Sequence, residues 1–390
     1  MALTVGHAMK PERLISLDAF RGFTIAGMIL VNNPGSWGHI YPQLAHASWH
    51  GWTFTDFIFP FFLWIVGVSM TFSFAVRRTK GDNNTKLILG VLRRSAIIFG
   101  LGLFLTGFPF GLLWGHNFNI DSIRIPGVLQ RIAICYLIAS FVYLYTSTRT
   151  QIITIGVLFI SYTMMMFYIP IPEFGAGLFE KGKNFASYID SILLTGHMWS
   201  ASKTWDPEGI ISTIPAIAST LFGALVGDYL RISEHSKIEK STWLFTFGAG
   251  FLLLGTIFDM WMPINKSLWT VSYTIFMAGW AMCIFSIFYF LIDAKGIKKW
   301  AYPFTVYGMN AIFVFVLSGV AARTMGMWKW NVQLSDGTYA DVSIKTILTQ
   351  NLFDPYFSPL NASLMHAIVW ISVMYLVVWV MYKKKWFVKV

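Results

Sequence analysis

The chain has 390 residues, of which 56% are hydrophobic, 17% aromatic and only 12% charged, and its mean hydropathy is +0.59. A soluble domain carries about 25% charged residues, so this composition leaves too little polar surface for a soluble globule or a disordered chain. The two cysteines, Cys135 and Cys283, both lie in apolar runs and exclude a disulfide scaffold. The sequence therefore predicts a polytopic integral membrane protein.

The formal net charge is +11, which in a soluble protein would point to nucleic acid. Here the basic residues cluster in short connections between apolar runs, at 77–80, 295–299 and 383–385. This is the distribution that the positive-inside rule describes for membrane proteins. We therefore expect no nucleic-acid partner and both termini in the cytoplasm.

Ten apolar stretches are long enough to cross a bilayer, which takes about 20 residues. Backbone polar groups in lipid must be satisfied within each segment, so we expect an all-α integral membrane protein with about ten transmembrane helices in a single domain, residues 1–390. The expected spans are 14–33, 54–76, 87–107, 126–146, 151–171, 209–230, 242–260, 268–293, 300–320 and 362–382.

The longer connections, 34–53, 108–125, 172–208 and 321–361, all fall on the outer side of this topology. They are rich in Trp, Asn, His, Asp and Gly. Long irregular segments in a compact protein are usually functional or disordered, and the aromatic content argues against disorder. We expect folded caps over a cavity that opens outward.

The segment from His46 to Asp56 concentrates polar and aromatic residues at one membrane boundary, with Trp49 and His50 between them. Imidazole titrates near neutrality and suits general-base chemistry. The spacing of the two histidines would allow a shared metal if the stretch were helical, but a zinc site needs a third ligand and the sequence has no HExxH pattern. We therefore expect no metal.

Other polar residues lie within or beside spans, where ionisable groups are costly and are functional candidates. Asp18 and Arg21 share one helical face, as an internal ion pair or a binding site, and Asn32 ends the first span. Asp206 and Glu208 precede the sixth span, where they could cap the helix or bind a ligand. The remaining candidates are Arg93, Arg94, Arg124, Arg131, Asn265, Lys266, Trp269 and Asn310.

Eight short blocks in fixed order resemble the heparan-α-glucosaminide N-acetyltransferase family, which includes the lysosomal enzyme and bacterial NagX-type relatives. The blocks run from near the N-terminus to the ninth span and so cover nearly the whole membrane domain. They are LDAFRG (17–22), VNN (31–33), HASWHG (46–51), TDFIFPFF (55–62), RIPGVLQR (124–131), DPEGI (206–210), INKSLW (264–269) and YGMNAI (307–312).

The resemblance implies transfer of an acetyl group from acetyl-CoA to the amine of a terminal glucosamine within a transmembrane tunnel. The essential histidine of the family matches His46 and its nearby asparagine matches Asn32. His50 stands where the lysosomal enzyme has Asn, and we expect no counterpart of that enzyme's N-terminal luminal domain, which leaves the acceptor sugar open. Relatives also suggest a homodimer, and the brief inner loops suggest a bacterial inner (cytoplasmic) membrane.

For the reaction we expect His46 to act as general base while Asn32 donates a hydrogen bond to the carbonyl oxygen. Asp56 or His50 would orient the imidazole. We favour direct transfer between two substrates bound together, with an acetyl-His46 intermediate as the alternative.

The two substrates need different partners. The phosphates of acetyl-CoA call for basic groups: Arg131 first, then Arg93, Arg94, Lys266 and Arg124. The acceptor would meet carboxylates that pair with its ammonium and rings that stack on its pyranose. The residues expected at the acceptor are Asp18, Arg21, Trp49, Asp206, Glu208, Asn265, Trp269 and Asn310.

Three other functions fit the composition. An amino-sugar permease, for instance for N-acetylglucosamine, would usually show repeated halves and broken helices, and no internal repeat is evident. A non-catalytic scaffold would leave the polar residues at membrane depth unexplained. An acyltransferase for another envelope glycan or a longer acyl chain remains open.

Overall fold

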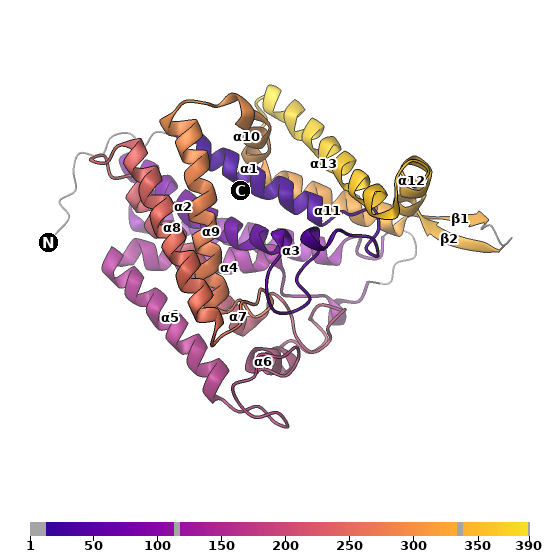
Figure 1. Ribbon diagram of the computed structural model, residues 1–390, viewed down its shortest axis with the longest axis horizontal. Coiled ribbons are helices and arrows are strands. Elements are labelled where there is room, and N and C mark those ends of the chain that lie inside the picture. The colour runs from indigo at the N-terminus through magenta and orange to yellow at the C-terminus, as the bar shows by residue number, and fades with distance from the viewer. Residues whose placement is uncertain (1–12, 113–117, 334–337, 389–390) are drawn as a thin grey trace.

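The apolar runs of the sequence fold into long helices in the computed structural model, which describes residues 13–112, 118–333 and 338–388 (Figure 1). In this described part, eight helices are long and apolar enough to cross a membrane. They are α2 (Phe54–Thr79), α3 (Asn84–Gly107), α4 (Val128–Tyr145), α5 (Thr148–Tyr168), α7 (Ile210–Leu230), α8 (Lys237–Asp259), α9 (Val271–Tyr289, continued as a π-helical turn to Ala294) and α13 (Pro359–Lys383).

The expected ten spans differ from this set at two places. Helices α10 (Tyr302–Met309) and α11 (Ala311–Met327) meet at a 71° bend, so the predicted span 300–320 is a broken one and makes at most a ninth. The predicted first span is α1 (Ile15–Val31), whose 17 residues extend about 26 Å, at the short end of what crosses a bilayer. The all-α, multi-pass architecture is confirmed, with eight or nine long apolar helices instead of ten.

The spanning helices form an inner and an outer group. In their most apolar windows, α2, α7 and α9 have 78%, 72% and 72% of their residues buried, whereas α3, α5 and α8 have only 28%, 22% and 22%. The outer group exposes large apolar side chains such as Leu89, Ile152 and Leu253. Such a surface suits contact with lipid, and Figure 1 shows α5 at the margin of the bundle.

Glycines bring α1 and α10 into backbone contact. A Cβ built on Gly22 of α1 would lie 1.6 Å from the carbonyl oxygen of Phe304 in α10, and one on Gly308 would lie 1.9 Å from that of Asp18. Small residues permit this close approach, which drives helix association in membranes. The same contact fixes the broken α10–α11 pair against α1.

The long connections that were predicted to lie on the outer side contain short elements. These are the 3₁₀ turns Pro42–Leu44 and Ile120–Ser122, the helices α6 (Phe185–Leu193) and α12 (Ile344–Leu352), and the antiparallel hairpin of β1 (Lys329–Gln333) and β2 (Tyr339–Ser343). The hairpin projects from the edge of the bundle beside α12 (Figure 1). Residues 113–117 and 334–337 of the predicted outer loops lie outside the described residues, as do 1–12 and 389–390. The sidedness of the termini stays a prediction.

Candidate active site

A histidine and a carboxylate face each other at the start of α2. Asp56 is the third residue of that helix and closes a capping box with Thr53, which fixes its carboxylate at the helix N-terminus. One oxygen, Oδ2, accepts from the backbone N–H of Thr53 (3.1 Å) and of Ala47 (3.0 Å). The other, Oδ1, lies 2.7 Å from Nδ1 of His46. Because a carboxylate only accepts, the imidazole donates from Nδ1 and keeps the lone pair of Nε2.

This pair combines a buried carboxylate with an accessible ring. The side chain of Asp56 is 1% exposed and that of His46 is 51% exposed. The chain at 46–52 forms a series of bends and is not helical, so the premise of the i, i+4 metal spacing was wrong. The arrangement can orient one imidazole tautomer, with Nε2 as its unprotonated nitrogen on a half-exposed ring.

The ammonium of Lys266 lies beside the imidazole of His46, although the sequence led us to expect Lys266 at the phosphates of acetyl-CoA. Its Nζ is 3.0 Å from Nδ1 and 3.3 Å from Nε2 of His46, and 3.6 Å from Oδ1 of Asp56. Burial lowers the pKa of Lys266, against the opposing effect of the Asp56 charge. A cation therefore sits beside the candidate base.

The loop that carries Lys266 is held against the loop of residues 46–52 by Asn265, the residue that precedes Lys266. The amide of Asn265 donates to the carbonyl oxygen of Trp49 (2.8 Å) and lies 3.4 Å from Nδ1 of His50. Burial lowers the pKa of His50. His50 thus faces Asn265, and the carboxylate that contacts the His46 imidazole is Asp56. Asn265 and Trp49, both expected at the acceptor, connect the two loops.

Arg131 contacts the loop that carries Lys266 through the ring of Trp269. It is the fourth residue of α4 and 1% exposed. Its Nη2 donates to the carbonyl oxygen of Gly209 (3.1 Å) and to the hydroxyl of Ser212. Its guanidinium lies 5.1 Å from the ring of Trp269, a buried residue with a φ of 51°. The N–H groups at Nε and Nη1 have no hydrogen-bond partner among the described residues.

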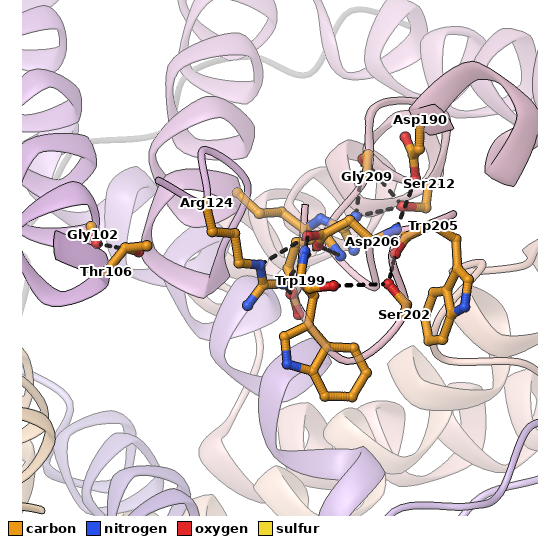
Figure 2. A network of polar contacts seen from close by, with 12 residues as sticks. Gly102, Thr106, Arg124, Asp190, Trp199, Ser202, Trp205, Asp206, Gly209 and Ser212 are labelled. Carbon is orange, nitrogen blue, oxygen red and sulfur yellow. Dashed lines mark hydrogen bonds and ion pairs between the residues drawn. The ribbon is translucent and has the colours of Figure 1, made fainter. Parts of the chain in front are cut away.

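Three further candidates bind one another, and Figure 2 shows two of them, Arg124 and Asp206. Arg124 donates from Nε and Nη2 to both oxygens of Asp206, at 2.8 and 2.6 Å, and from Nη2 to Glu208. Although burial opposes it, hydrogen bonds and charge from the two acids raise the pKa of Arg124. We assigned Arg124 to acetyl-CoA and the acids to the acceptor, but these side chains are occupied by each other.

Sequence reasoning missed Asp190, which lies in α6 with its side chain aimed at the same loop (Figure 2). Its oxygens accept from the backbone N–H of Asp206 (3.2 Å) and Ile210 (3.0 Å). Burial raises the pKa of Asp190 to about 6. The only signal in the sequence was one carboxylate within an otherwise uncharged stretch, 185–194.

The other candidates are placed elsewhere. Asp18 pairs with Arg21 at 3.0 Å, near the opposite end of α1 from Asn32. The amide of Asn310 holds the C-terminal segment through Trp386 (3.1 Å) and Val388 (2.9 Å). In α3, Arg93 is exposed and Arg94 lies 5.1 Å from the ring of Tyr136.

Asn32 lies at the end of α1 and lines a cavity of about 1010 Å³. His46 is not among the described residues that line this cavity. The two residues expected to share the reaction both lie in the chain between α1 and α2, but among the described lining residues only Asn32 belongs to this cavity.

Comparison with known proteins gives a consistent result. Residues 13–243 match the family described as heparan-alpha-glucosaminide N-acetyltransferase, catalytic. Two curated relatives carry the name heparan-alpha-glucosaminide N-acetyltransferase. The mouse protein is 27% identical over 97% of this chain and 61% of its own length, and the human protein is 29% identical over 78% of this chain and 52% of its own length.

The chain thus spans between half and two thirds of the length of these relatives. The matched segment includes His46, Asp56, Arg124 and Arg131, while Lys266 lies beyond it. Since the match covers more than half of the chain, this protein belongs to the heparan-alpha-glucosaminide N-acetyltransferase family.

Proposed function

We propose that this protein is a membrane-embedded acetyltransferase that moves an acetyl group from acetyl-CoA to the amine of glucosamine or of a glucosamine-terminated saccharide. The contact between Nδ1 of His46 and Oδ1 of Asp56 carries this proposal, because it leaves Nε2 as a base on a half-exposed ring. An amine must lose a proton to form an amide, and an imidazole titrates in the range where it can accept one.

In the proposed step His46 takes a proton from the acceptor amine at Nε2 as the nitrogen attacks the thioester carbonyl carbon. A C–N bond forms, the C–S bond breaks, and the proton held on Nε2 passes to the departing sulfur. Asp56 keeps the ring in one tautomer throughout. Asn32 would donate a hydrogen bond to the carbonyl oxygen as it gains charge.

Lys266 gives this scheme a second electrostatic component. The ammonium of Lys266 lies 3.3 Å from Nε2 of His46, close to where the thioester carbonyl would bind in this scheme. The same cation would stabilise the developing oxyanion. In the alternative route, Nε2 itself attacks the thioester carbonyl carbon, the C–S bond breaks and CoA leaves as the thiol. The amine then attacks the acetyl group on Nε2, the bond to Nε2 breaks and the free histidine is restored.

The phosphates of acetyl-CoA need hydrogen-bond donors, and two guanidinium groups fit. Arg131 has unpartnered N–H groups at Nε and Nη1 and Arg94 has one at Nε, within the described residues. Buried guanidinium donors suit phosphate oxygens. From the family resemblance we also propose a homodimer in the inner membrane of a bacterium.

The test is a mass-spectrometric transfer assay on detergent-purified protein with acetyl-CoA and glucosamine. His46→Ala should abolish acetylated product while size-exclusion and thermal-unfolding profiles match the wild type. His235→Ala, which removes an exposed histidine from another loop, is the matched control and should keep full activity. Full activity of His46→Ala would overturn the assignment of the base.

One feature favours a permease as the second candidate, namely the broken span formed by α10 and α11. Broken helices in transporters usually expose free backbone or side-chain groups to a substrate. At this break, however, both ends of the Asn310 amide are hydrogen-bonded to the C-terminal segment. Uptake of labelled sugar into proteoliposomes without acetyl-CoA would support the permease.

A further inference from the structure

The turn that carries Lys266 is built around a tryptophan with an unusual backbone. Trp269 has a φ of 51°, in the left-handed region that bulky side chains rarely adopt. Such a conformation persists only where the surrounding structure holds it in place. The residue is 0% exposed, so no face of its ring is open to a sugar, although the sequence led us to expect Trp269 at the acceptor.

Helices α2, α4, α7 and α9 each contribute a side chain that contacts this ring. Its Nε1 donates to the hydroxyl of Ser219 in α7 at 3.1 Å, and the guanidinium of Arg131 in α4 lies 5.1 Å from the ring. The rings of Phe59 in α2 and Tyr273 in α9 pack edge-on to it, with centroids 5.0 and 5.3 Å away. Since α7 also packs against α2, α4 and α9, the ring of Trp269 lies where these helices meet.

The backbone of Trp269 is tied to that of Lys266. The N–H of Trp269 donates to the carbonyl oxygen of Lys266 at 3.1 Å, which closes a turn over residues 266–269. Within this turn, the N–H of Leu268 donates to the side-chain oxygen of Asn265 (2.9 Å), and the carbonyl oxygen of Leu268 accepts from the hydroxyl of Tyr162 in α5 (2.8 Å). The direction in which the Lys266 side chain leaves the turn therefore depends on the backbone conformation at Trp269.

From this turn the ammonium of Lys266 reaches the imidazole of His46. Nζ lies 3.3 Å from Nε2 of His46 and 3.6 Å from Oδ1 of Asp56. A lysine side chain is long and flexible, so its ammonium is held in place only if its backbone is fixed. A misplacement of about 1 Å in an active site can cost about 10²-fold in rate.

We propose that Trp269 is a positioning residue, whose ring, held by Ser219 and Arg131, fixes the turn that places the ammonium of Lys266 beside Nε2 of His46. This role rests on the proposed function, because Lys266 stabilises an oxyanion only in that scheme. Trp269 itself touches neither substrate and acts through Lys266. Once the ring loses a contact, the left-handed backbone relaxes and the turn moves with it.

The first measurement needs no turnover. Diethyl pyrocarbonate modifies the unprotonated nitrogen of a neutral imidazole, and tandem mass spectrometry locates the adduct at His46. At about pH 8, where an imidazole is neutral, Lys266→Met should uncover Nε2 and raise the rate of modification by roughly three- to tenfold, the range that loss of one hydrogen bond gives. Trp269→Phe keeps a ring but loses the bond to Ser219, and should raise the rate to the same extent.

A second variant and a matched control accompany Trp269→Phe. Ser219→Ala removes the acceptor and leaves the indole, so it gives the same test if the ring change prevents folding. The control is Trp370→Phe in α13, because Nε1 of Trp370 donates to the hydroxyl of Ser318 at 2.9 Å. It loses the same kind of bond and should leave the modification of His46 unchanged. His235, an exposed histidine on another loop, is the internal reference for the reagent.

A double-mutant cycle in the transfer assay tests whether Trp269 acts through Lys266. Trp269→Phe should lower kcat by roughly 10- to 100-fold while KM for acetyl-CoA stays within about twofold of the wild type. In the Lys266→Met background the same change should cost less than about twofold, because residues that act through one group are not additive. Equal costs in the two backgrounds would show that Trp269 acts independently of Lys266 and would overturn the inference.

The outcomes separate this inference from the proposed function. Unchanged modification of His46 in Trp269→Phe, with or without a rise in Lys266→Met, would overturn the inference even where acetyl transfer is observed. A rise in both variants without any acetylated product would instead support the positioning of Lys266 and count against the acetyltransferase. A raised KM for acetyl-CoA in Trp269→Phe, with kcat and the modification of His46 unchanged, would mean that the ring acts through Arg131 and would also overturn the inference.

Discussion

Nδ1 of His46 and Oδ1 of Asp56 lie 2.7 Å apart, although the residues are ten positions apart in the sequence. The carboxylate that orients the imidazole also closes the capping box of α2 with Thr53. The same side chain therefore sets the start of an inner helix and the tautomer of the candidate base. A helix N-terminus stabilises a carboxylate, so Asp56 stays ionised where His46 needs an acceptor.

Replacing Asp56 with Asn separates its role in capping α2 from its role in fixing the tautomer of His46. An asparagine can still accept a hydrogen bond from the capped backbone, but it no longer forces the proton onto Nδ1 of His46. We expect kcat/KM for acetyl transfer to fall by roughly 10²–10⁴-fold, the range that general-base catalysis supplies, while the melting temperature changes little.

The control for this variant is Asp341→Asn, which changes a carboxylate on the projecting hairpin and should leave kcat/KM unchanged. Activity of Asp56→Asn within a factor of two of the wild type would show that the imidazole needs no carboxylate partner. A large drop in melting temperature would mean that the capping role dominates.

Lys266 predicts a loss of rate when its charge is removed. Its ammonium lies 3.0 Å from Nδ1 of His46, where it would stabilise the oxyanion that forms at the thioester carbonyl. In Lys266→Met, kcat should therefore fall by roughly 10²–10³-fold, the range that one oxyanion donor supplies. Lys266→Arg, which keeps the charge, should retain most of the wild-type kcat.

The measurement is kcat and the KM for acetyl-CoA of each variant. A raised KM with an unchanged kcat would instead support the role that the sequence suggested for Lys266, at the phosphates of acetyl-CoA. One kinetic experiment thus separates the two roles.

The sequence located the His46–Asp56 segment because both residues belong to one local motif at a helix start. It could not choose between Asp56 and His50 as the orienting partner, since that depends on how bends at 46–52 turn each side chain. Lys266 lies 220 positions from His46, and only the packing of two loops brings them together.

The ion pairs of Arg124 with Asp206 and Glu208 also could not be predicted from the sequence. Asp206 and Glu208 were readable as polar groups before a span, but their partner Arg124 is 82 and 84 positions away. Sequence composition reports that a charge is present near the membrane and not whether another charge already satisfies it. The all-helical architecture was predictable because hydropathy acts locally. The sequence also shows Asn310 interrupting the ninth apolar run, but the 71° bend there and the contacts of its amide with the C-terminal segment are seen only in the structure.

Asp190 predicts how stability depends on pH. Burial raises its pKa in the folded protein to about 6, above the value of about 4 for an exposed aspartate. The folded state therefore holds this proton more tightly than the unfolded state, and stability falls as the pH rises from about 4 to about 6 and levels off above that range. Melting temperatures of the detergent-purified protein across pH 4 to 8 should show this decline.

In Asp190→Asn the part of the decline due to this side chain should vanish, because an amide does not titrate. Asp121→Asn, at an exposed site of the same outer side, should retain the wild-type profile. A slope that is the same in wild type and Asp190→Asn would show that another group titrates in this range.

The contact between α1 and α10 gives the last prediction. Since a Cβ on Gly22 would lie 1.6 Å from the Phe304 carbonyl oxygen, Gly22→Ala forces the two backbones apart and should destabilise by at least the 1–3 kcal/mol typical of overpacking. Gly100→Ala in α3, where nothing lies within 4 Å of the added Cβ, is the matched control and should be neutral or slightly stabilising, as alanine favours helix. Thermal unfolding in one detergent compares both, and equal melting temperatures for the two variants would mean that α1 and α10 are not in backbone contact.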